Sequence, residues 1–92
     1  MTLDATLTDF ITRRLQDSLQ PSHLAVTDES HQHQGHAGWR EGGETHFRID
    51  IVSDAFRGKS RVERHRIVNE ILGAAFERGL HALAIKARAP GE

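Results

Sequence analysis

The sequence predicts an α+β fold with the element order α-β-β-α-α-β and a mixed three-stranded sheet. Two observations predict it: two stretches repeat apolar residues with a helical period, and three short stretches alternate apolar with polar residues. At 92 residues the chain is long enough for one domain with a modest core. We therefore expect a single domain over residues 1–92, with a long His/Gly-rich loop at about residues 29–44.

The first helix is expected over about residues 3–19, and two strands follow it. Pro21 ends the helix because proline cannot continue one. Residues 23–28 and 45–52 then alternate apolar with polar or small side chains, as half-buried strands do. The apolar positions of these three segments are Leu3, Leu7, Ile11, Leu15 and Leu19, then Leu24 and Val26, then Phe47, Ile49 and Ile51.

The second half of the chain predicts a turn or short helical piece at DAFRGK, a helix from Ser60 and a last strand, HALAIKA. Ser60 and Glu63 match a capping box, and Gly79 stands where a left-handed residue ends a helix. Gly73 lies inside this helix at a cost of about 1 kcal/mol relative to alanine. The buried face of the helix is expected to hold Ile67, Val68, Ile71, Leu72, Ala75 and Phe76.

The connections predict how the strands pair. A right-handed β-α-β crossover makes the last strand parallel to the 45–52 strand, which the loop joins antiparallel to the first strand. The helices then cover one face of the sheet.

Composition restricts the class of protein. There is no cysteine, so the fold has no disulfide. Lys and Arg (12) nearly balance Asp and Glu (13), so the net charge offers no whole-chain attraction for nucleic acid. The start, MTLDATLTDF, lacks a basic region followed by an apolar run, and no stretch approaches the roughly 18 apolar residues of a membrane span. We expect a cytoplasmic protein with no membrane segment. The sequence contains no nucleophile motif that would indicate an enzyme.

Seven histidines are the main chemical feature, and the loop sequence HQHQGHAG holds three of them, His31, His33 and His36. Imidazole is the commonest metal ligand, so these residues are candidates for zinc or iron, although a solvated histidine-rich loop fits the spacing as well. His81 opens the last strand in a more rigid position, where a ligand and a packed structural histidine are about equally favoured. His46 alternates with Phe47, and we expect it to have a structural role on the opposite face of its strand.

A basic segment, residues 57–66, precedes and opens the second helix. It carries five Lys/Arg residues against one Glu, so it could contact a partner or phosphate groups at the helix N-terminus. Trp39, alone in the loop, is a further candidate contact residue. The basic candidates are Arg57, Lys59, Arg61, Arg64 and Arg66.

The run ETHFRIDIVSDAFRGKSRVERHRIVNEIL, followed by GLHALAIKARAP, closely resembles the BolA family, and the resemblance covers residues from about 4 to 90. It implies a fold similar to the type II KH domain. It also implies binding to a monothiol glutaredoxin and a shared [2Fe–2S] cluster, of which the glutaredoxin cysteine and a glutathione thiolate hold one side. The family is also associated with transcriptional control.

By the same resemblance, His81 of the HAL motif matches the C-terminal cluster ligand. The second ligand lies in the loop and is His or Cys in different subgroups, so this cysteine-free chain resembles the His subgroup. Counting forward from Asp28 favours His33, whereas the Gly-His-Ala context favours His36, with His31 also available. The alternative function is a DNA-binding regulator that uses the basic segment, although the KH signature GXXG is incomplete at residues 58–61.

Overall fold

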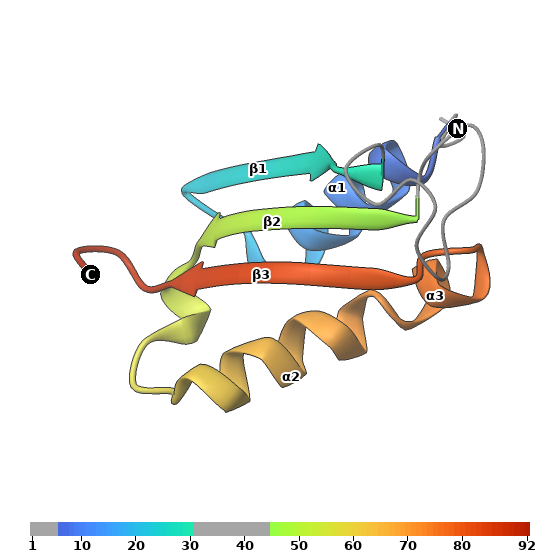
Figure 1. The fold of residues 1–92 in the computed structure, drawn as a ribbon. Coiled ribbons are helices and arrows are strands. Elements are labelled where there is room, and N and C mark those ends of the chain that lie inside the picture. Colours follow the sequence, from blue (N-terminus) through green and yellow to red (C-terminus); the bar gives the residue numbers. More distant parts are fainter. Residues whose placement is uncertain (1–5, 31–44) are drawn as a thin grey trace.

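Three strands form a sheet that helices cover on one face (Figure 1). The computed structural model describes residues 6–30 and 45–92. The predicted α-β-β-α-α-β order is confirmed, and a short 3-10 helix, η2, occupies the DAFRGK segment. The elements are α1 (Leu7–Leu19), β1 (His23–Asp28), β2 (His46–Val52), η2 (Asp54–Phe56), α2 (Arg61–Ile71), α3 (Gly73–Glu77) and β3 (Ala82–Arg88).

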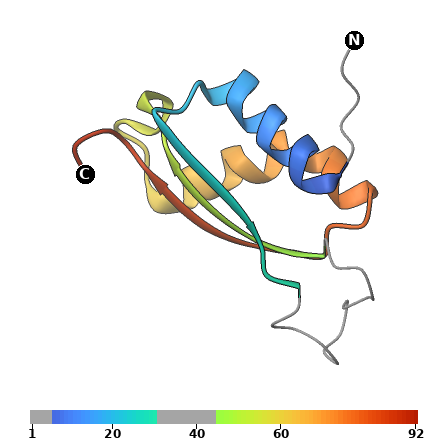
Figure 2. The ribbon, with the colours of Figure 1, turned by 90° about the horizontal axis from the view of Figure 1, so that it is seen from above.

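The sheet is mixed, as the connections predict. β2 lies in the middle, antiparallel to β1 and parallel to β3, so β1 and β3 are its edges. In the register, Ile49 of β2 stands opposite Val26 of β1 and Ile85 of β3. Seen from above, the helices lie together on one side of the three strands (Figure 2).

The core lies between this face of the sheet and the helices. Successive strand residues point to opposite faces, so Phe47, Ile49 and Ile51 of β2 all turn toward the helices. The leucine and isoleucine stripe of α1 is buried against them, as the four-residue spacing predicts. The buried core residues include Leu7, Ile11 and Leu15 of α1, Phe47, Ile49 and Ile51 of β2, and Val68, Leu72 and Ala75 beside them.

The first helix begins later than the periodicity predicts. Thr6 has an extended backbone, and its hydroxyl accepts a hydrogen bond from the Asp9 amide at 3.1 Å, so it caps a helix that starts at Leu7. Thr6 is therefore not helical, contrary to the predicted start at about residue 3. Residues 1–5 lie outside the described part of the chain. Gln20 follows the helix with a left-handed backbone (φ 45°).

The capping box at the start of α2 is confirmed, but the helix is not continuous. Ser60 and Glu63 exchange side-chain hydrogen bonds with each other's backbone amides at 2.9 and 3.1 Å. The helix is interrupted at Leu72, and α3 starts at Gly73. This is the position at which the sequence predicted that a glycine would destabilise a continuous helix. Phe76 was predicted on the buried face of this helix, but it is 38% exposed.

No helix within residues 6–30 and 45–92 is long and apolar enough to cross a membrane. Gly79 adopts the positive φ of 110° expected for the residue that ends the helical segment.

Candidate histidine site

His81 lies exposed at the end of the sheet where β3 begins. The strand itself starts one residue later, at Ala82, so the prediction that His81 opens the strand is off by one position. The amides of both residues donate hydrogen bonds to the carbonyl oxygen of Thr45, at 2.7 and 3.1 Å. The backbone of His81 is therefore fixed against the residue that precedes β2, while its side chain faces solvent.

His46 packs beside His81. The two ring centroids are 5.3 Å apart, and the ring planes are inclined by 54°. His46 is buried, with 6% of its surface exposed, as the structural prediction for this residue expects. The parallel register places His46 opposite Ala82, and this pairing brings together two histidines that are 35 positions apart in the sequence.

A buried chain of hydrogen bonds holds the His46 ring. The Ser30 hydroxyl donates to the Asp28 carboxylate at 2.5 Å and accepts the Thr45 hydroxyl proton at 3.2 Å. The Thr45 oxygen lies 2.9 Å from Nδ1 of His46. This contact holds the His46 ring through its Nδ1 atom.

The same residues fix both ends of the histidine-rich loop. The Ser30 hydroxyl oxygen also accepts the backbone amides of Thr45 and His46, at 2.8 and 3.1 Å. Ser30 and Thr45 are each 1% exposed, so the two loop ends meet in a buried contact next to His81. The candidate residues His31, His33, His36 and Trp39 lie outside the described residues.

The described residues do not make a complete metal site by themselves. No group of three or more His, Cys, Asp or Glu side chains within residues 6–30 and 45–92 could hold a metal ion. A hollow of about 200 Å³ adjoins His46 and has Phe47 and Leu83 in its wall. A metal at this end of the sheet would need further ligands from residues 31–44 or from another molecule.

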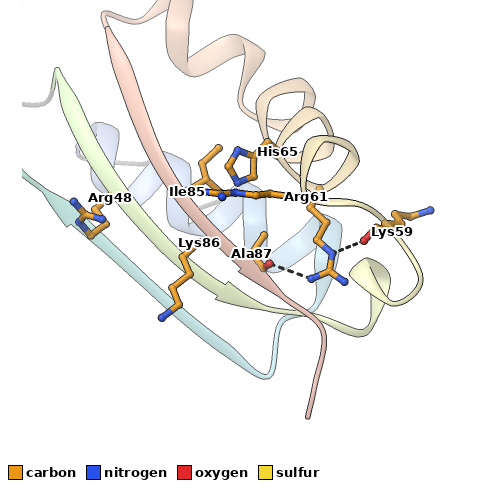
Figure 3. Close-up of a pocket in the computed structure, with 8 residues that line it drawn as sticks. Arg48, Lys59, Arg61, His65, Ile85, Lys86 and Ala87 are labelled. Carbon is orange, nitrogen blue, oxygen red and sulfur yellow. Dashed lines mark hydrogen bonds between the residues drawn. The ribbon is translucent and has the colours of Figure 1, made fainter. Parts of the chain in front are cut away.

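The basic segment is divided among several places. Arg57 pairs with Asp54 at 2.8 Å, and Arg66 lines a small hollow together with Glu63 and Glu70. The other three candidates, Lys59, Arg61 and Arg64, line a groove of about 640 Å³ between α2 and β3 (Figure 3). Lys59 also lines the small hollow, so the two hollows adjoin at this residue, while Arg57 is engaged in its ion pair.

Arg64 is held in place by several hydrogen bonds. Its guanidinium donates to the carbonyl oxygens of Lys59 (2.9 Å) and Ala87 (3.3 Å) and to the Glu92 carboxylate (2.8 Å). These contacts join the start of α2 to the segment after β3. The Arg64 hydrogen bond, helped by the Ala89 amide, lowers the pKa of Glu92 from 4.5 to about 2, and the pairing raises the pKa of Arg64.

The chain folds into a small α+β domain with a pair of histidines at one end of its sheet. A family model described as "BolA-like protein" matches residues 15–92, and the chain belongs to this family. An uncharacterized protein of Sinorhizobium is 49% identical over 94% of both chains. The protein named DNA-binding transcriptional regulator BolA, from Vibrio cholerae, is 40% identical over 84% of this chain and 69% of its own length.

Solved structures agree with this assignment. The BolA domain of SufE1 from Arabidopsis thaliana superposes with a TM-score of 0.84 at 44% identity, covering 97% of this chain and 96% of that domain. The longer SufE-like protein 1 of the same plant is 49% identical over 89% of this chain, which spans 23% of that protein. The predicted KH-like, BolA-like fold is thus confirmed, and the similarity to the longer protein concerns its BolA part.

Sequence reasoning missed the pairing of His46 with His81 and two cations of the groove, Arg48 and Lys86. A signal for the pair was present in the sequence. In a β-α-β unit the two parallel strands begin at the same edge of the sheet, and a histidine stands at the start of each. The groove has no such signal because its cations come from three separate elements.

Proposed function

We propose that this protein binds a monothiol glutaredoxin and supplies histidine ligands to a [2Fe–2S] cluster that bridges the two proteins. The glutaredoxin cysteine and a glutathione thiolate would hold the other side of the cluster. His81 is one ligand on this chain, and a loop histidine, His33 or His36 with His31 as a further candidate, is the second. The role is that of a non-enzymatic adaptor in iron–sulfur trafficking or iron-dependent regulation, and we place it in the cytoplasm.

One observation carries the proposal: the His81 amide is hydrogen-bonded to Thr45, where the histidine-rich loop rejoins the sheet. Ser30, where the loop leaves the sheet, is bonded to the same residue. A segment with three histidines thus starts and ends beside an exposed histidine. This arrangement supports a site completed by one loop residue and one residue of the fixed sheet.

The donor set of this chain fits such a cluster. The sequence has no cysteine, so the ligands that this chain offers to iron are histidine imidazoles, and thiolate ligands must come from the partner. Two neutral imidazoles in place of two thiolates make a cluster less negative and raise its reduction potential, as in Rieske centres. The exposed side chain of His81 at the sheet end is accessible to a partner's cluster.

His46 has a positioning role in this proposal. Its ring is buried, bonded through Nδ1 and in contact with the His81 ring, so it limits the directions that the His81 imidazole can take. Partners of this kind hold a metal ligand in its binding orientation. A loose His81 would lose part of the affinity for the cluster because its side chain would have to be ordered on binding.

The test is reconstitution of the cluster with a monothiol glutaredoxin and glutathione, followed by visible circular dichroism of the mixed complex. His81→Ala is expected to abolish the spectrum of the heterocomplex, leaving that of the glutaredoxin alone. One of His33→Ala and His36→Ala should do the same, and this identifies the second ligand. His46→Ala should weaken cluster binding about 10-fold or more, in the range found for outer-shell partners of metal ligands.

His23→Ala is the matched control, because His23 is also exposed but lies at the start of β1, at the other end of the sheet from His81. Its spectrum should be that of the parent protein. A heterocomplex spectrum unchanged by His81→Ala would disprove the proposal.

DNA binding through the basic segment is the alternative function. The cationic groove and the name of the Vibrio cholerae relative favour it. The groove lining contains no Phe, Tyr or Trp ring on which a base could stack, and only three of the five basic candidates line it. We therefore rank glutaredoxin binding first and test nucleic acid as a competing ligand below.

A further inference from the structure

The outer edge of β3 carries backbone groups that are directed away from the sheet. β3 is an edge strand in the sheet that the described residues form. The Arg88 carbonyl accepts the Ser53 amide on the β2 side, whereas the Ala87 carbonyl accepts the Arg64 side chain on the outer side. The backbone amide and carbonyl of successive strand residues point alternately toward and away from the neighbouring strand. Those of Leu83 and Ile85 therefore point outward, as those of Ala87 do. An outer edge of this kind is a template for pairing with another strand.

Positive charge surrounds this edge. The 640 Å³ groove has Ile85 and Ala87 of β3 in its floor, and its lining contains no acidic side chain. Figure 3 shows nitrogen-bearing side chains on both sides of the strand: α2 and the residues before it bring Lys59, Arg61 and His65 to one side, and the sheet brings Arg48 and Lys86 to the other.

Three of these cations are available to a ligand. Lys59, Arg61 and Lys86 are exposed. Arg64 is committed to the carbonyls and carboxylate described above, and Arg48 bonds Glu29 at 2.9 Å, although its side chain remains 59% exposed. A ligand for this groove must therefore carry negative charge along an extended length.

We propose that the groove binds an extended acidic segment of a protein partner, which pairs with β3 as an added strand. A peptide backbone offers both donors and acceptors, which match the alternating amides and carbonyls of the β3 edge. A nucleic-acid backbone offers acceptors to the lysines and arginines but no donors to the outward carbonyls of Leu83 and Ile85. A second copy of β3 would bring the same cations into contact, so like charges oppose self-pairing.

This surface is independent of the histidine site. The groove includes Ile85, Lys86 and Ala87, near the end of β3, whereas His81 precedes its start. Variants in the groove should therefore leave the cluster spectrum unchanged, and His81→Ala should leave peptide binding unchanged. Either proposal can fail without the other.

The test uses the full chain and a fluorescent peptide of alternating glutamate and valine, about eight residues long, with fluorescence anisotropy at low salt. The peptide is expected to bind, and a peptide with lysine in place of glutamate is not. In ¹⁵N NMR spectra the largest amide shifts should fall on Leu83, Ile85 and Ala87, the outward positions of the strand. Binding should weaken as salt is raised.

Charge reversal locates the interaction. Lys86→Glu and Arg61→Glu should each weaken peptide binding about 10-fold, because each replaces an attraction by a repulsion. Arg66→Glu is the matched control: it makes the same charge change on α2 but lies outside the groove lining, and its effect should be within about twofold. Thermal unfolding of each variant checks that the fold is kept.

Several outcomes would overturn the inference. No binding of the acidic peptide would mean that the cations only protect the edge from pairing. Equal weakening by Arg66→Glu would show binding to overall charge, and amide shifts away from β3 would place the contact elsewhere. Displacement of the peptide by a short oligothymidine at lower concentration would assign the groove to nucleic acid.

Discussion

The two ends of β3 hold their functional side chains in opposite ways. At the start, the His46 ring is buried and fixed by a hydrogen-bonded chain that runs through two hydroxyls to Asp28. Toward the other end, Lys59, Arg61 and Lys86 are exposed on long side chains, and Arg64 alone is fixed by several bonds. The first end is ordered before any ligand binds, and the second can adapt to its ligand.

This difference indicates different ligands. A metal ligand needs its ring held in a set orientation, and the buried His46 ring limits the orientations of the neighbouring His81 ring. A flexible acidic segment needs charge over a length, which several mobile cations supply without fixed geometry. The comparison predicts that stability depends most on the residues of the histidine end and that salt affects the groove end more.

The largest expected effect is at Ser30. Ser30→Ala removes the oxygen that accepts the amides of Thr45 and His46 and leaves these buried donors without a partner. We expect a loss of about 3 kcal/mol in the free energy of unfolding, measured by urea denaturation. Ser22→Ala is the control, because the exposed Ser22 hydroxyl makes only a 3.5 Å contact with Val52, and it should change little. If Ser30→Ala and Ser22→Ala lowered the free energy of unfolding equally, the stabilising role of the Ser30 hydrogen bonds would be refuted.

A smaller effect is expected at the start of α2, next to the groove. Ser60→Ala removes one half of the capping box and should cost about 1 kcal/mol of unfolding free energy. Ser60→Asp keeps an oxygen that can cap the helix and should retain most of the stability. If both substitutions had the same cost, the cap would not be the cause.

The sequence predicted most of the fold because local patterns carried it. The strand over residues 23–28 and the capping box at Ser60 were found at the observed positions, since alternation and capping depend on neighbouring residues. The break at Leu72 was missed, because one glycine changes the helix only in combination with the packing around it. The start of α1 was placed too early, since Leu3 continues the apolar spacing beyond the cap at Thr6.

The candidate site was predictable only in part. His81 was identified from its motif and position. Its contact with His46 depends on the register between β2 and β3, and register is set by the whole packed sheet rather than by either strand. The groove cations Arg48 and Lys86 gather with α2 only after the chain folds, so the basic segment alone gave an incomplete picture.

The smallest expected effect concerns Glu92 and its pH dependence. The pKa of Glu92 is lowered from 4.5 to about 2, mainly by Arg64, so the ion pair contributes its full stability above about pH 4.5. That contribution is lost as pH falls through the lowered pKa of about 2. Carboxyl ¹³C chemical shifts should give a Glu92 midpoint near 2, and Arg64→Gln should raise it. A midpoint near 4.5 in the parent protein would contradict the pairing.

The most direct test of the central claim is pulsed electron paramagnetic resonance of the reduced mixed complex. This chain would carry ¹⁵N-labelled histidine, and the glutaredoxin would be unlabelled. We predict strong couplings from two ¹⁵N nuclei bound to iron, and no such coupling in His81→Ala, which does not form the mixed cluster. A mixed cluster without strong ¹⁵N coupling would contradict the assignment of histidine ligands to this protein.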